Sequence, residues 1–248
     1  MRSVKSLPVL AVGLFLCLGS ASQAAEAPPG AADGAAPISL PWTAQGNEPN
    51  WILTLDAGRL IYRTADGAIT IEAPLPKADR RDGAWIYGAP QADLTISVER
   101  KICRDTMTGM PSPFSVAVQS GGKTVTGCGG NPSDLLGGSE WRIISVNDRP
   151  VPEDVKVTLE FDTGAGQAFG SSGCNRYFGA FKLSGEGLNL GQGMAGSMMA
   201  CEAIPTAIER SFLSALAKVQ RFDIASDGTL LLITDDRVTL RSRPRSEK

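Results

Sequence analysis

Histidine is absent from the 248-residue chain, and this absence removes several classes of chemistry. Without an imidazole, neither a Ser-His-Asp nor a Cys-His nucleophile can form. A zinc site that contains histidine is excluded as well. A zinc site built from four cysteines would remain, but the chain has no C-x-x-C pair. We therefore expect no metal, no cofactor and no enzymatic activity.

An excess of one charge and long apolar runs are also missing from most of the chain. The sequence has 24 Lys and Arg against 26 Asp and Glu, a formal net charge of −2. This balance gives no reason to expect a nucleic-acid partner. The one basic cluster, Arg241–Arg245, is expected to be a solvated terminus. We expect a monomer with no transmembrane span once an N-terminal signal is removed.

The first 24 residues have the pattern of a secretory signal peptide. A charged start is followed by an apolar run, Val9–Leu18, and by small residues up to Ala24. We expect cleavage after Ala24 and a periplasmic location. Lipidation of Cys17 is the alternative, but Leu16 stands where a lipidation motif has a small residue.

Four cysteines remain after such cleavage. An exported protein meets an oxidising compartment, so an even count predicts disulfides. Sequence alone permits three pairings, and we expect the two local ones. Each local bond closes a loop of about 25 residues, which the chain-entropy argument values at about 3–4 kcal/mol. The expected pairs are Cys103–Cys128 and Cys174–Cys201.

The chain up to about Asn131 divides into a leader and a set of short strands. Residues 25–39 are rich in Ala, Pro and Gly and are expected to be flexible. Residues 40–131 show no convincing helix, and their strand spacing predicts a small barrel or sandwich. Asp56-Ala57-Gly58 and Ser120-Gly121-Gly122 are expected turns. The expected strands are Trp51–Leu55, Arg59–Arg63, Ala68–Ala73, Leu94–Glu99, Phe114–Val118 and Lys123–Cys128.

A second domain is expected over residues 136–243, after the breaks at Asn131–Asp134 and Gly137-Gly138. Apolar residues alternate with polar ones over 155–162, which predicts a strand with one buried and one solvated face. A period of three to four residues over 204–219 predicts an amphipathic helix. The fold class is therefore mainly β, two small antiparallel barrel-like or sandwich-like domains, the second with one packed helix. Its other expected strands are Trp141–Val146, Ala168–Ser172, Tyr177–Leu183, Phe222–Ala225, Leu230–Thr234 and Val238–Arg241.

This second half resembles the META domain, the family of the heat-shock protein HslJ. The resemblance rests on Trp141, the alternating strand, the segment Gly173–Gly179, Met198–Cys201 and the helix with Glu209. It implies a curved antiparallel sheet or partial barrel with a helix packed against it. It also implies a link to heat stress, envelope integrity and, in some members, novobiocin resistance. No catalytic activity comes with it.

The first half is similar to an uncharacterised exported module that often accompanies META domains. The similarity rests on Gly46–Trp51, Cys103–Pro111 and Thr126–Gly130. It implies a location more than an activity. The arrangement is also loosely similar to small, disulfide-linked β-barrel inhibitors of lysozyme.

Five residues form a candidate binding surface. Asn175, Arg176 and Tyr177 offer side chains common at interfaces. The competing interpretation, which we favour, is that Asn175 caps the turn and Tyr177 packs on the sheet. Arg104 and Asp105 offer a second polar group, but a salt-bridged turn held by a disulfide is favoured there.

Three further groups have both a structural and a functional interpretation. Met194, Met198 and Met199 would be soft ligands for copper(I), although core filling is favoured. Asp235-Asp236 would be a carboxylate pair for acid–base chemistry, although a hairpin turn is favoured. Asn47-Glu48-Pro49 before Trp51 would shape a ligand edge, but we favour the start of a strand with a core tryptophan.

The sequence thus predicts a non-enzymatic periplasmic protein for stress tolerance. We expect it to bind or stabilise an unidentified component of the envelope. The alternative is a proteinaceous inhibitor of a hydrolase such as lysozyme, which a direct inhibition assay would distinguish.

Overall fold

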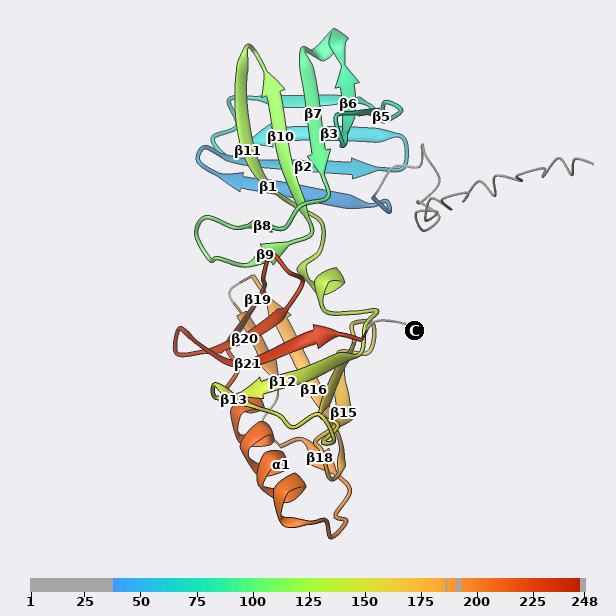
Figure 1. Ribbon diagram of the computed structural model, residues 1–248. Coiled ribbons are helices and arrows are strands. Elements are labelled where there is room, and N and C mark those ends of the chain that lie inside the picture. The colour runs from blue at the N-terminus through green and yellow to red at the C-terminus, as the bar shows by residue number, and fades with distance from the viewer. Residues whose placement is uncertain (1–37, 186, 191–192, 246–248) are drawn as a thin grey trace, which may run out of the picture. The chain divides into compact units, whose positions relative to one another are not determined.

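The computed structural model describes residues 38–185, 187–190 and 193–245, which belong to one compact unit (Figure 1). The expected signal peptide, 1–24, and the expected leader except for Ile38 and Ser39 lie outside these residues. The described part is mostly antiparallel β-structure with one α-helix, as the sequence predicts. None of its helices has the length and apolar character that a bilayer crossing requires.

The first sheet has nine antiparallel strands in the order β4-β3-β2-β1-β11-β10-β7-β6-β5. A separate two-stranded sheet joins β8 (Cys103–Arg104) to β9 (Pro111–Ser112). Two short 3-10 helices are η1 (Pro90–Ala92) and η2 (Pro132–Leu135). The strands of the large sheet are β1 (Trp42–Asn47), β2 (Asn50–Asp56), β3 (Arg59–Thr64), β4 (Thr70–Pro74), β5 (Asp79–Arg81), β6 (Ala84–Ala89), β7 (Leu94–Glu99), β10 (Phe114–Ser120) and β11 (Lys123–Gly129).

Both expected hairpin turns of this sheet are present. Asp56 pairs with Arg59 across Ala57-Gly58, and Ser120 pairs with Lys123 across two glycines. Gly58 and both glycines of the second turn have positive φ, a conformation that glycine adopts without steric cost.

Three strands of the first sheet, β1, β5 and β6, were not expected from the sequence. In β1 the inward positions are Trp42, Ala44 and Gly46, so two of the three carry little or no apolar side chain. The period-two signal depends on large apolar residues at the buried positions. A strand whose buried positions are occupied by alanine and glycine therefore shows no period-two pattern of apolar residues.

Tryptophan side chains fill the first core where glycines leave room for them. Trp51 is 1% exposed, and a Cβ at Gly127 would lie 2.7 Å from its ring. A Cβ at Gly129 would lie 2.4 Å from the ring of Trp42. The glycines of the segment Thr126–Gly130 thus make the close approach of two large rings to β11 possible. The interpretation of Trp51 as a core residue is confirmed.

The second sheet has ten strands, and its main path runs β17-β16-β15-β14-β12-β21-β20-β19. The Leu188 N–H donates to the Gln220 carbonyl over 2.7 Å, so the two ends approach each other and the barrel is nearly closed. Its strands are β12 (Trp141–Val146), β13 (Arg149–Pro150), β14 (Thr158–Asp162), β15 (Gln167–Ser171), β16 (Arg176–Ser184), β17 (Gly187–Leu190), β18 (Ala195–Gly196), β19 (Arg221–Ile224), β20 (Leu230–Thr234) and β21 (Arg237–Pro244).

The alternating segment 155–162 departs from its expected pattern. β14 begins only at Thr158, and Val157 forms an isolated bridge to Ser172. Thr158 is 2% exposed, although a solvated side chain was expected there. Its carbonyl accepts the Tyr177 hydroxyl and its Oγ1 accepts the Ser171 N–H, so its polar atoms are satisfied inside the protein.

The expected helix is α1 (Ala203–Leu216), which packs against β12 and β21 (Figure 1). Phe212 and Leu216 are fully buried, and the Phe212 ring meets Tyr177 edge-on with centroids 5.4 Å apart. Ile204 was expected on the same buried face, but it is 64% exposed. It lies in the first turn and does not pack on the core, whereas Ile208, one turn later, does.

Candidate functional site

Cys103 and Cys128 form a disulfide that joins β8 to β11, with their Cα atoms 5.4 Å apart. It holds the loop 103–112 against the first sheet. Met110 of this loop is 7% exposed and packs in the core of the second sheet. The disulfide therefore fixes to the first sheet a loop that contributes Met110 to the second core.

Arg104 and Asp105 do not form the salt-bridged turn that we favoured. The Arg104 Nε donates to both carboxylate oxygens of Asp223, each over 3.0 Å, and its Nη2 donates to the Ile224 carbonyl over 2.9 Å. Asp105 instead accepts from its own loop, with Thr108 N–H at 2.8 Å and Met107 N–H at 3.0 Å. Arg104 and Asp105 thus bind different partners and do not form a common site.

The Asn47 amide links the turn between β1 and β2 to the loop 103–112. It donates to the Asp105 carboxylate and to the Thr106 hydroxyl, both over 3.0 Å. Partial burial opposes ionisation of Asp105, but the hydrogen bonds from Asn47, Thr108 and Met107 outweigh it and lower the pKa of this carboxyl. Two of the three segments on which the similarity of the first half rests are therefore joined by hydrogen bonds.

A groove with a volume of about 1250 Å³ lies beside this loop. Its lining includes Asp105 and Asp134 together with Arg100 and Lys182. The Asp105 carboxylate already accepts hydrogen bonds from its own loop at Oδ1 and from Asn47 at Oδ2, so it is not a free partner of Asp134 for acid–base work. Within the described ranges, no group of three or more Cys, Asp or Glu residues is arranged to hold a metal ion.

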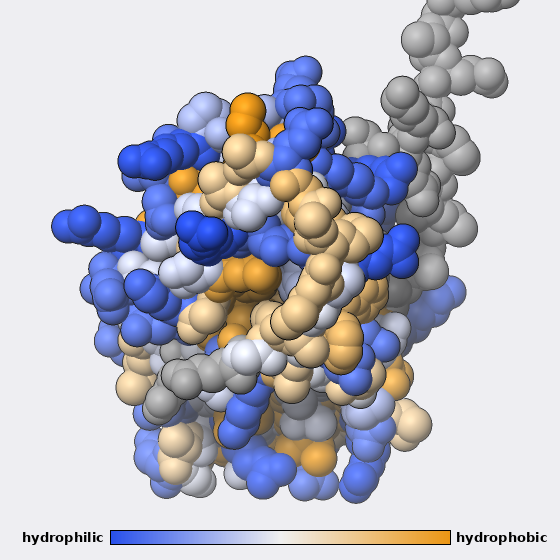
Figure 2. Space-filling model, turned by 90° about the horizontal axis from the view of Figure 1, so that it is seen from below, coloured by the Kyte–Doolittle hydropathy of each residue, from blue (hydrophilic) through white to orange (hydrophobic). Residues whose placement is uncertain are grey.

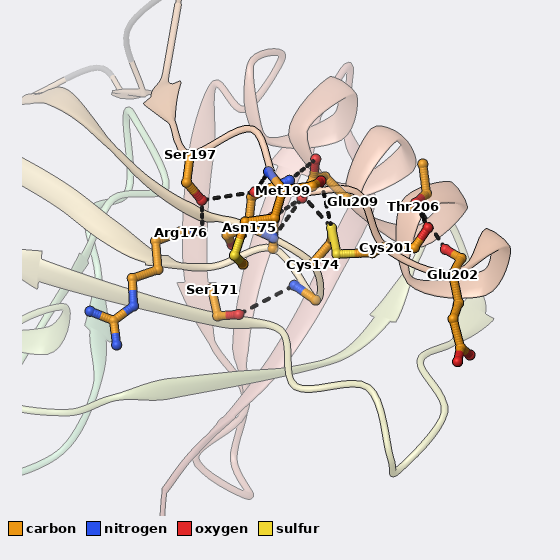
Figure 3. The surroundings of a disulfide bond; sticks show 12 residues. Ser171, Cys174, Asn175, Arg176, Ser197, Met199, Cys201, Glu202, Thr206 and Glu209 are labelled. Atoms are coloured by element: carbon orange, nitrogen blue, oxygen red, sulfur yellow. Dashed lines mark hydrogen bonds between the residues drawn. A yellow bond between two sulfur atoms is a disulfide. The ribbon is translucent and has the colours of Figure 1, made fainter.

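The second disulfide, Cys174–Cys201, joins the turn before β16 to the segment before α1 (Figure 3). The Cα atoms are 5.9 Å apart. The two disulfides are thus the two local pairs that the sequence analysis favoured. This second bond ties a β-turn to the start of the helix.

Asn175 is the centre of a hydrogen-bond network around this disulfide (Figure 3). It is 8% exposed. Its backbone N–H and its side-chain Nδ2 donate to the two carboxylate oxygens of Glu209 over 2.9 and 3.1 Å. Its Oδ1 accepts from the Ser197 hydroxyl over 2.8 Å and from the Met199 N–H over 2.7 Å. One buried amide thus connects the turn, the segment after β18 and α1.

Glu209 closes this network from the helix. Partial burial opposes its ionisation, but hydrogen bonds from the Ser172 hydroxyl and from Asn175 outweigh it, so the pKa of Glu209 is lowered. The ionised carboxylate is therefore the form that the fold stabilises. The sequence analysis placed Glu209 on the helix but did not find this role.

We expect Glu209→Gln to lower the free energy of unfolding at neutral pH by about 1–3 kcal/mol, because an amide nitrogen would face the donors of Asn175. The contribution of Glu209 is complete above the pKa of the unfolded carboxyl and is lost as the pH falls through its lowered folded pKa. Urea unfolding across the acidic range should therefore show a shallower acid limb in the variant. An unchanged pH dependence would contradict the role of Glu209.

Tyr177 and Arg176 point to opposite sides of β16. Tyr177 is 3% exposed, and its hydroxyl donates to the Thr158 carbonyl over 2.7 Å. Burial and the nearby charge of Glu160 raise its pKa. The Arg176 side chain is exposed and points away from the network in Figure 3. Of the candidate residues Asn175, Arg176 and Tyr177, only Arg176 is therefore exposed to solvent.

The same half of the chain also has a group of exposed apolar side chains. Five of the nine exposed large hydrophobic side chains of the described residues lie on β15 and β16, in the segment between β18 and α1, and in the first turn of α1. On the sheet, Phe169 of β15 pairs with Phe178 of β16, and Phe178 pairs with Ala195 of β18. Figure 2 shows hydrophobic residues on one face of the molecule, with hydrophilic ones around them. We call the five exposed side chains together the apolar surface: Phe169 (37% exposed), Phe178 (57%), Met198 (99%), Met199 (59%) and Ile204 (64%).

The adjacent residues Tyr177 and Phe178 of β16 indicate this surface in the sequence. Consecutive residues of a strand point to opposite faces, so Tyr177 and Phe178 cannot both be buried under one sheet. The favoured core-filling role is correct for Met194, which packs at Gly179, and wrong for Met198 and Met199, which are exposed.

Comparison with known proteins agrees with the resemblance noted from the sequence. The family model of the META domain matches residues 134–247. A search of curated proteins finds no match. Among solved structures, an NMR structure of a protein from Burkholderia xenovorans is 30% identical over 47% of this chain and 90% of that chain, with a TM-score of 0.39.

Proposed function

The C-terminal half of this chain carries a META domain, and from this premise we propose a non-enzymatic protein of envelope stress tolerance. It acts in the periplasm by binding or stabilising an envelope component that presents apolar polypeptide. The observation that carries the proposal is the apolar surface. Phe169 and Phe178 are cross-strand neighbours, and exposed apolar side chains that adjoin one another are typical of a surface that contacts a partner.

The apolar surface is built on fixed elements, which favours binding. Its aromatic pair lies on paired strands, and its methionines lie in a segment held by β18, by Asn175 and by the Cys174–Cys201 disulfide. Side chains on a pre-organised backbone lose little conformational freedom when a partner binds.

The charges near the surface are mixed, which points to an apolar partner rather than a polyanion. Arg176 and Lys182 are exposed on β16, while Glu160 pairs with Phe169 and the exposed Glu202 precedes Ile204. A surface for a polyanion would need a concentration of positive charge.

A complementation experiment tests the proposal. A strain that lacks the gene should lose viability under heat stress, and the wild-type gene should restore it. The double variant Phe169→Ser/Phe178→Ser should accumulate to the same level but fail to restore viability, because it loses the exposed aromatic pair.

Ile52→Ser is the matched control, since Ile52 is 54% exposed on β2 of the first sheet. It should restore viability fully. Full restoration by the Phe169→Ser/Phe178→Ser variant would refute the role of the apolar surface. Near-stoichiometric inhibition of lysozyme by the mature protein, unaffected by that variant, would support the inhibitor alternative instead.

A further inference from the structure

The sulfur atoms of the described chain fall into two chemical groups. All four described cysteines are joined in disulfides, Cys103–Cys128 and Cys174–Cys201. No described cysteine is therefore a free thiol that would react first with an oxidant. The thioethers of methionine are the remaining sulfur that a two-electron oxidant can reach.

The five described methionines differ widely in exposure. Met198 is 99% exposed, Met107 76% and Met199 59%, whereas Met110 is 7% exposed in the second core. Met194 is partly buried, and a Cβ at Gly179 would lie 2.4 Å from its sulfur. Oxidants should therefore reach three methionines well before the other two.

Met198 and Met199 lie where oxidation changes the surface but not the fold. The backbone before them pairs with β16, and the Met199 N–H donates to Asn175 Oδ1 over 2.7 Å. Cys201 anchors the chain two residues later through its disulfide. The backbone is thus held on both sides, while the Met198 side chain packs on nothing that a sulfoxide would disrupt.

We propose that Met198 and Met199 form a reversible oxidation site that switches the apolar surface to a polar state. The pair supplies two of the five side chains of that surface. A sulfoxide oxygen turns an apolar thioether into a polar group, which weakens contact with an apolar partner. The regulatory consequence rests on the proposed binding function, but the chemical modification does not.

Hypochlorous acid is an oxidant of the required class. The sulfur lone pair attacks chlorine and hydroxide leaves. Water then displaces chloride from sulfur, and loss of protons leaves the sulfoxide. Sulfur is oxidised by two electrons and chlorine is reduced by two. A dithiol reductase reverses the step, since the dithiol becomes a disulfide and the sulfoxide oxygen leaves as water.

Peptide mass spectrometry of the disulfide-intact protein, treated with increasing hypochlorous acid, tests the modification. Met198 and Met199 should be half-oxidised at a dose about tenfold lower than Met110, and the thermal midpoint should stay unchanged over that dose range. Oxidation of Met110 as early as Met198, or unfolding at the first dose, would overturn the proposal.

Retention on a phenyl resin tests the switch without knowledge of the partner. Oxidation should reduce the retention of the wild type and of Met107→Leu, because both keep Met198 and Met199. The Met198→Leu/Met199→Leu variant keeps an apolar surface that cannot be oxidised, so its retention should change little. Equal losses in both variants would overturn the switch. If oxidation changes retention as expected but the strain with the Phe169→Ser/Phe178→Ser variant survives heat normally, the oxidation switch is supported and the proposed function is refuted.

Discussion

Replacing both Cys174 and Cys201 by serine is expected to lower the free energy of unfolding by about 3–4 kcal/mol. The bond spans 27 residues, and its loss restores conformational freedom to that loop in the unfolded chain. It also frees the segment that bonds to Asn175 and leads into α1. The Asn175–Glu209 hydrogen bonds remain, so we expect a folded but weakened second sheet rather than a disordered one.

Thermal and urea unfolding of the variant measure this effect. The control is the wild type in the presence of dithiothreitol, which removes both disulfides. The reduced wild type should be less stable than the oxidised variant, because the variant keeps Cys103–Cys128. If the oxidised variant and the oxidised wild type unfold at the same midpoint, the Cys174–Cys201 bond makes no contribution.

Gly127→Ala is expected to destabilise the first sheet by about 3 kcal/mol or more, because the added methyl group has no space. Its Cβ would lie 2.1 Å from the Gln45 carbonyl oxygen and 2.7 Å from the Trp51 ring. One contact is backbone of β1 and the other is a ring that is 1% exposed, so neither group can move aside easily. Trp51 or the neighbouring strands must shift.

Gly88→Ala is the matched control for this substitution. Gly88 also lies in a strand, β6, but a Cβ there would meet no atom within 4 Å, and its φ is not positive. We expect a change within about 0.5 kcal/mol for Gly88→Ala. Urea unfolding and tryptophan fluorescence of both variants decide the question. Equal stability of the two would show that the core around Trp51 relaxes more readily than its packing indicates.

Features with short-range causes could be predicted from the sequence. The hairpin at Asp235-Asp236 is present, and both residues have positive φ, as a tight two-residue turn requires. The helix around Phe212 followed from its apolar period. Strand β1 could not be predicted in the same way, since alanine and glycine at its inward positions give no apolar period.

The candidate site was predicted less well than the fold. Asn175 was singled out, but its partner Glu209 lies 34 residues away on another element. Phe178 was overlooked because an apolar residue in a β-strand is normally assigned to the core. Which side of β16 faces solvent depends on where α1 packs, and that packing buries Tyr177 and leaves Phe178 outside.

The sequence by itself determined the antiparallel β class, the local turns and the helix, because each depends on residues within one segment. It favoured the local cysteine pairs among three possible pairings, and the structure contains those two pairs. Only the tertiary structure decided that Arg104 binds Asp223, 119 residues away, rather than its neighbour Asp105. The tertiary structure also decided that Met198 is exposed, three residues before the disulfide-bonded Cys201. Contacts between distant segments depend on the path of the whole chain, and no local pattern of residues encodes that path.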